Sequence, residues 1–249
     1  MKGPNLWPVY KGESFNIWTP DTGAYYAHAN PEQLIKHLHE KRLRQSRTKT
    51  SAFYGADPEW LDDPKTLPCL FPRIAFRDTT HPTNRRTTIA CLIPPEVFLT
   101  NMAPYLLFPP NQCKEEAYFL GVLSSVPFDW YSRRVVELHL TINIFNSCPV
   151  PRPPADSTHR KHVIYLAGRL AAVDDRYEDW ASQVGVSVAS VKSEEEKADL
   201  IAELDAAVAL LYGLDESDIQ IIYHTFHTTT DHLPKIDAVL SHYRNLQNA

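Results

Sequence analysis

The chain has 249 residues, of which 43% are hydrophobic and 22% are charged, a composition typical of a folded globular protein and not of a disordered one. No apolar run approaches the ~20 residues that a membrane-spanning helix needs, and the N-terminus lacks the apolar core of a signal peptide, so we expect a cytoplasmic protein without a membrane partner. The net charge of −5, taken for the whole chain, argues against nucleic-acid binding.

The charge is unevenly divided along the chain. Residues 1–155 carry 17 Lys and Arg against 14 Asp and Glu, a net charge of +3, whereas residues 156–249 carry 8 against 16, a net charge of −8. Four prolines crowd into residues 149–154, which is typical of a connection between domains. We therefore predict an α+β protein in which a mixed α/β domain, 1–155, is followed by an acidic helical domain, 156–249.

The first part of the chain is expected to contain short strands and one clear helix. Pro20-Asp-Thr-Gly23 predicts a turn between two strands, and Asn30-Pro31 predicts the start of a helix with Asn30 as its N-cap. Residues 71–78 and 85–94 are predicted to be two strands of a hairpin, joined by a polar tip at 79–84.

The rest of the chain is expected to be mostly helical. Helices are predicted at 115–125, 128–136, 159–184, 193–213, 215–224 and 231–245, with Gly185 and Gly213 as stop signals and a capping box formed by Ser193 and Glu196. One strand is predicted at 138–145, where Leu138, Leu140, Ile142 and Ile144 alternate with other residues.

Motifs of several enzyme classes are absent from the sequence. It has no GxGxxG or GxxxxGK[ST] loop, no GxSxG elbow and no zinc-deaminase signature. The acid pairs at 62–63 and 174–175 are typical of solvated surfaces, and the four scattered cysteines predict reduced thiols. We therefore predict no catalytic residue and no metal ligand.

Arginines cluster around the predicted hairpin. Arginine matches the guanine edge and phosphates, and asparagine matches the adenine edge, so this cluster is a candidate DNA-binding surface. Arg73 and Arg77 are expected to share one face of the first strand, and the simpler alternative is that these arginines form surface salt bridges with Asp62, Asp63 and Asp78. The candidates here are Arg73, Arg77, Thr80, Asn84, Arg85 and Arg86.

A second basic group lies in residues 36–49, where it would follow the phosphate backbone or else form an ordinary solvated face. Arg133, beside Trp130 and Tyr131, is a candidate clamp on nucleic acid, or else covers the core with its aliphatic stem. The candidates from these segments are Lys41, Arg42, Arg44, Arg47, Lys49 and Arg133.

Nearly the whole chain also contains, in order, segments that resemble one family. Each is weak alone, and the ordered set is more specific. They are Leu6–Glu13, Pro72–Arg77, Asn84–Thr87, Ile93–Pro95, Leu120–Ser125 with Trp130-Tyr131, Phe145–Pro151, and Glu203–Asp205 with Leu211–Leu214.

The chain resembles, through these segments, the target-recognition region of adenine-N6 DNA methyltransferases, including single-chain type II restriction–modification enzymes and phage-defence methylases. The resemblance implies double-stranded DNA as a partner. The [N/D/S]PP[Y/F] motif and cofactor loop of such methylases are missing, because the Pro-Pro pairs here occur as Ile-Pro-Pro-Glu, Phe-Pro-Pro-Asn and Arg-Pro-Pro-Ala. It therefore also implies a catalytic methyltransferase half, in the same or a separate chain, which would bind S-adenosylmethionine; this chain would bind no cofactor and would not be an enzyme on its own.

Two other functions remain open at this point. The chain could be a protein-docking module of a defence complex that never contacts DNA, using its acidic helices. It could also be a nuclease whose metal site the sequence does not reveal.

Overall fold

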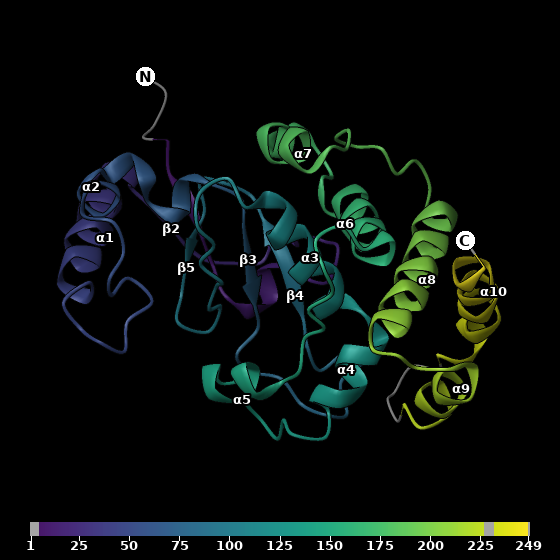
Figure 1. The fold of residues 1–249 in the computed structure, drawn as a ribbon. Helices are drawn as coiled ribbons and strands as arrows, with labels where there is room; N and C mark the ends of the chain where they lie inside the picture. Colours follow the sequence, from purple (N-terminus) through teal and green to yellow (C-terminus); the bar gives the residue numbers. More distant parts are fainter. Residues whose placement is uncertain (1–4, 227–231, 249) are drawn as a thin grey trace.

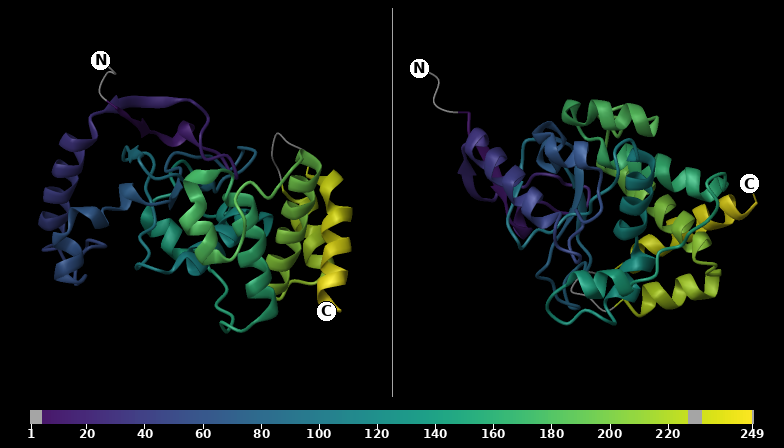
Figure 2. Two further views of the ribbon diagram at one scale, coloured as in Figure 1. Left: turned by 90° about the horizontal axis from the view of Figure 1, so that it is seen from above. Right: turned by 60° about the vertical axis from the view of Figure 1, so that its left-hand side comes forward.

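The computed structural model describes residues 5–226 and 232–248 of the chain (Figure 1). Strands gather in the N-terminal part and helices dominate the C-terminal part, which confirms the predicted fold class. Helices α1 and α2 lie at one end of the molecule and α8 to α10 at the other (Figure 2). No helix in the described ranges is both long and apolar enough to span a bilayer.

Two small sheets form the strand-containing part. β1 (Trp7–Tyr10) lies between β2 (Tyr25–Ala29), with which it is antiparallel, and β5 (Phe98–Leu99), with which it is parallel. β3 (Arg73–Phe76) and β4 (Ala90–Ile93) form an antiparallel pair. The hairpin predicted at 71–94 is confirmed, but its strands are shorter than expected, so Arg77, Arg85 and Arg86 lie in the connecting loop.

Helix α1 (Pro31–Gln45) carries most of the basic group of residues 36–49, and the short helix α2 (Pro58–Asp62) contacts α1. The Asn30 side chain accepts a hydrogen bond from the Gln33 backbone N–H, which confirms the predicted N-cap. Short 3-10 turns at Gly12–Ser14, Pro64–Thr66 and Pro68–Leu70 connect the elements of this half.

Three helices follow the hairpin: α3 (Cys113–Ser124), α4 (Val126–Ser132) and α5 (Ile142–Ser147). The strand predicted at 138–145 is wrong. His139 forms only an isolated bridge with Thr79, and Thr141 then caps a helix by accepting from the Ile144 N–H at 3.3 Å. This local cap, together with Leu138 lying 54% exposed, breaks the alternation that the sequence indicates.

The C-terminal part contains α6 (Thr158–Ala171), α7 (Glu178–Val184), α8 (Glu194–Leu211), α9 (Glu216–His224) and α10 (Ile236–Gln247). The single helix predicted at 159–184 is two helices, because the Asp174 side chain accepts the Arg176 N–H in a 3-10 turn at Asp175–Tyr177. A second such turn, Leu233–Lys235, precedes α10. The predicted start of that last helix at 231 lies outside the described residues.

The predicted stop and start signals of the C-terminal helices are partly confirmed. Gly185 and Gly213 both have positive φ at helix ends. The Ser193 hydroxyl accepts the Glu196 N–H, but the Glu196 carboxylate accepts from Lys192 N–H and so does not complete a capping box.

One hydrophobic core crosses the proline-rich segment. Its main cluster joins buried residues of the hairpin and α3, such as Ile74 and Leu120, with buried residues of α6 and α8, such as Val163 and Leu204. The Tyr118 hydroxyl also donates to the carbonyl of Pro151 at 2.9 Å, which ties the segment to α3. The division into two domains at residue 155 stays a prediction, and the two parts share their interior.

Candidate nucleic-acid interface

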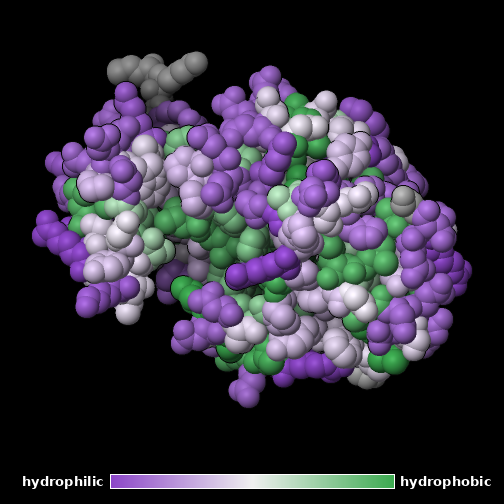
Figure 3. All heavy atoms as spheres, in the orientation of Figure 1, coloured by the Kyte–Doolittle hydropathy of each residue, from purple (hydrophilic) through white to green (hydrophobic). Residues whose placement is uncertain are grey.

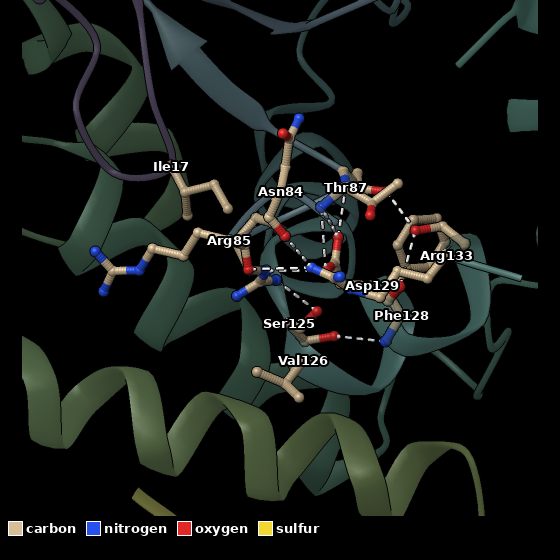
Figure 4. Close-up of polar contacts among 12 residues, drawn as sticks. Ile17, Asn84, Arg85, Thr87, Ser125, Val126, Phe128, Asp129 and Arg133 are labelled. Carbon is tan, nitrogen blue, oxygen red and sulfur yellow. Dashed lines mark hydrogen bonds and ion pairs between the residues drawn. The ribbon is translucent and has the colours of Figure 1, made fainter. Parts of the chain in front are cut away.

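The loop between β3 and β4 folds onto α4 through a buried carboxylate. Asp129 is fully buried and accepts hydrogen bonds from the backbone N–H of Thr87, at 2.9 Å, and of Thr88, at 2.5 Å (Figure 4). The Thr88 hydroxyl donates to Ser132 on the same helix at 2.8 Å. Side chains of α4 therefore make the hydrogen bonds at the end of the loop that a neighbouring strand would make in a sheet.

Two arginines complete this cluster. Arg133 Nε lies 3.1 Å and Arg86 Nε 3.4 Å from Asp129 Oδ2, so both form ion pairs with the buried carboxylate. Arg86 Nη2 also donates to the carbonyls of Ser124 and Ser125, at 2.7 Å each. A buried carboxylate with two cations and two backbone donors is well compensated for its loss of hydration.

Arg133 also donates hydrogen bonds to the loop. It donates to the carbonyls of Pro82, of Asn84 at 2.8 Å and of Arg85 at 3.1 Å. Its guanidinium carbon also lies 4.1 Å from the centre of the Phe226 ring. Burial lowers the pKa of Arg133, and the neighbouring Asp129 opposes that shift.

We call residues 80–88 the tip, in place of the predicted 79–84; it has a buried interior and an exposed outer side. Inside, the Thr80 hydroxyl donates to the carbonyl of Thr87 at 2.6 Å. Outside, the side chains of Thr83, Asn84 and Arg85 are exposed. Figure 4 shows the Asn84 and Arg85 side chains directed away from Asp129. An asparagine amide and an arginine guanidinium on a fixed loop are groups that can pair with base edges or phosphates.

The other two candidate arginines of the hairpin point into the protein. Arg73 is 5% exposed and donates to the carbonyls of Pro68, Phe71 and Val97, and burial lowers its pKa. Arg77 donates to the carbonyl of Phe15, and burial lowers its pKa as well. Arg77 lies beyond the end of β3, so the two arginines are not on one strand as expected. Their guanidinium groups donate to carbonyls of the protein, and neither lies at the tip.

The proposed salt-bridge alternative also differs from what is found. Asp78 pairs with His139, at 2.8 Å, and Asp63 accepts the Lys65 N–H as a cap. Arg86 of the loop and Arg133 at the end of α4 pair instead with Asp129, which was not among the predicted site residues. The sequence does contain a signal for Asp129, because it is an acid near the end of the largely apolar run 117–130. An acid buried in such a run needs polar partners.

The second basic group forms part of the surface around α1, which we call the basic lobe. It consists of the exposed side chains of Lys36, Lys41, Arg44, Arg47 and Lys49. Figure 3 shows hydrophilic side chains projecting from this end of the molecule. Arg42 faces inward instead, donating to Thr66 Oγ1 at 2.9 Å and to the Asp63 carbonyl at 2.8 Å, so it is not available to bind DNA.

The structure thus brings Thr80, Asn84, Arg85, Arg86 and Arg133 together at the tip, and it places the basic lobe elsewhere. Within residues 5–226 and 232–248, no cluster of three or more His, Cys, Asp or Glu side chains could hold a metal ion. All four cysteines are free thiols.

No family model matches the chain, and no curated protein matches it. A solved structure of the type IIL restriction–modification enzyme MmeI in complex with DNA aligns with 98% of this chain at 16% sequence identity and a TM-score of 0.41. The alignment covers 31% of that chain, so this chain spans about a third of its length.

Proposed function

We propose that this chain recognises a specific DNA sequence as the non-catalytic part of an adenine-N6 DNA methyltransferase or restriction–modification enzyme. The observation that carries the proposal is the tip, whose backbone is held by Asp129 and Arg133 while Asn84 and Arg85 face solvent. Recognition of a DNA sequence needs side chains that are held in a fixed geometry against the base edges. The ordered resemblance to target-recognition regions supports the same function.

The basic lobe would supply contacts that do not depend on sequence. Lys41, Arg44, Arg47 and Lys49 are exposed on α1 and the turn after it. Flexible cations of this kind neutralise phosphates and release counterions. The lobe would therefore hold the duplex, while the tip would select the site.

The chemistry of methyl transfer would belong to a catalytic half in the same or a separate chain, and S-adenosylmethionine would bind there. The acidic helices of residues 156–249 would support the recognition part or contact that half. The assembly would act in the cytoplasm.

Selection from a random pool tests the proposal directly. The full chain is incubated with random duplexes at low salt, and bound DNA is amplified and sequenced over several rounds. We expect one short motif to be enriched. A bound pool that stays random would contradict sequence-specific recognition.

A second candidate is protein docking without DNA contact. It is favoured by exposed apolar side chains from the end of α4 to the start of α5, where Tyr131, Val135, Leu138 and Ile142 are each more than a third exposed. Failure of the chain to shift any duplex in low-salt gels would support docking over DNA recognition.

A further inference from the structure

The residues that hold the tip are distinct from the residues that the tip exposes. Asp129 has no exposed surface, and Arg133 directs its guanidinium at the carbonyls of Pro82, Asn84 and Arg85. From the sequence, Arg133 was a candidate clamp on nucleic acid or a residue that covers the core with its aliphatic stem. In the structure its guanidinium donates to carbonyls of the loop that carries Asn84 and Arg85.

We propose that Asp129 and Arg133 are positioning residues that determine DNA sequence discrimination by fixing the conformation of the tip, without touching DNA themselves. This inference rests on the proposed function. It assigns a role to a buried ion pair that lies behind the exposed surface.

The hydrogen bonds of the tip explain why it depends on these two side chains. Residues 80–88 lie between β3 and β4 and have no strand partner along their length. Asp129 accepts the N–H groups at the end of the loop, and Arg133 donates to carbonyls at its centre. These two side chains therefore satisfy donors and acceptors that would otherwise turn to water and allow other loop conformations.

The C-terminal helices hold α4 in place from the other side. Asp205 on α8 accepts the Val126 N–H at 2.7 Å, and Trp130 Nε1 donates to Thr225 Oγ1 at 2.9 Å. With Phe226 against the Arg133 guanidinium, the acidic helical part contributes to the position of the tip. Residues far apart in the sequence thus determine the conformation of one loop.

We expect discrimination between DNA sequences to depend on the fixed conformation of the tip more strongly than the overall affinity for DNA does. Pairing with a base edge requires a side chain within about 0.5 Å of its productive position. Phosphate contacts from lysines and arginines on flexible stems tolerate larger displacements. Loosening the tip would therefore reduce selectivity while the basic lobe still binds DNA of any sequence.

The experiment compares Asp129→Asn with the wild-type full chain. Asparagine keeps the shape of aspartate but loses the charge and turns one acceptor into a donor, which faces the N–H groups of Thr87 and Thr88. Asp174→Asn is the matched control, because Asp174 forms an exposed pair with Arg176 away from the tip. The readouts are amide hydrogen exchange, motif enrichment from random duplexes, and low-salt binding to one arbitrary duplex.

We expect Asp129→Asn to speed amide exchange at Thr87 and Thr88 by at least about tenfold, with β3 and β4 unchanged. Motif enrichment should fall by a similar factor, and low-salt affinity for the arbitrary duplex should stay within about twofold. Asp174→Asn should change none of the three. If Asp129→Asn fails to fold, Arg133→Lys gives the same readouts, because lysine keeps the charge but cannot reach three carbonyls at once.

Unchanged exchange at the tip in a folded variant would overturn the inference. Enrichment of the same motif to the same extent by wild type and variant would also overturn it, with the proposed function intact. If the wild type enriches no motif, the proposed function fails and the role in discrimination fails with it.

Discussion

Gly121 on α3 faces Val163 on α6 so closely that a β carbon added to the glycine would lie 2.7 Å from Val163 Cγ1. The two residues lie on opposite sides of the proline-rich segment in the sequence; both are buried, and Val163 belongs to the main core. The contact joins the strand-containing part to the helical part without room for a methyl group.

Gly121→Ala is expected to destabilise the whole protein by about 1–3 kcal/mol, because overpacking forces the two helices apart. Urea denaturation followed by circular dichroism measures this change. We expect one transition, shifted to lower urea. Gly12→Ala is the control, since its added β carbon would meet Arg77 Cγ at an ordinary 3.5 Å. Two separate transitions would instead favour two independent domains.

Arg85→Ala is expected to weaken binding to the selected DNA motif by about 1–3 kcal/mol at one base position, because Arg85 is exposed at the tip. Stability should change by less than about 0.5 kcal/mol, as at other exposed positions. Gel shifts with single-base variants of the motif measure the effect. Arg176→Ala, at an exposed pair on the other part of the chain, should leave DNA binding unchanged.

Arg73→Ala is expected to act on stability and not on DNA contacts. The substitution leaves the buried carbonyl of Val97 and the part-buried carbonyls of Pro68 and Phe71 without their donor, at a cost of about 3 kcal/mol. Urea denaturation checks the loss. A variant with wild-type stability and lost DNA binding would show that Arg73 contacts DNA after all.

Replacing Lys41, Arg44, Arg47 and Lys49 together by alanine is expected to weaken binding to all duplexes alike. Each lost phosphate contact should reduce the slope of log affinity against log salt by about 0.9. Titrations over a range of salt concentrations measure the slope. The control replaces the exposed Lys114 and Lys161, which lie outside the basic lobe, and a matching loss of slope there would argue against a dedicated surface.

Glu116→Gln is expected to change the pH dependence of stability. Burial raises the pKa of Glu116 from 4.5 to about 7. Trp180 Nε1 donates a hydrogen bond to the Glu116 carboxylate, and this bond partly opposes the shift. Because the folded-state pKa is raised, the protonated form contributes stability that is lost as pH rises from about 4.5 to 7.

Glutamine keeps an acceptor for Trp180 and carries no charge. The variant should therefore match wild type near pH 5 and be more stable by up to about 3 kcal/mol near pH 8. Thermal denaturation at the two pH values measures the difference. An equal difference between the proteins at both pH values would contradict the shifted pKa.

The elements that could be predicted are those whose signals are local. Asn30 caps α1, and Gly185 ends α7, because each acts on backbone groups within four residues. The predicted strand at 138–145 failed because Thr141 offers a local cap that competes with the alternating pattern. The two apolar segments were enough to predict the hairpin, but they did not predict where its strands end.

The arginines show what only the tertiary structure decided. The sequence by itself determined the mixed fold class, the basic and acidic parts and the presence of a polar, arginine-rich tip. Whether each arginine faces solvent depended on carbonyls and carboxylates that lie far away along the chain: Val97 for Arg73, Phe15 for Arg77 and Ser124 for Arg86. The sequence around an arginine can look the same whether its side chain is buried or exposed. A buried guanidinium is stable only where the fold provides hydrogen-bond acceptors, so acceptors far away in the sequence decide between the two.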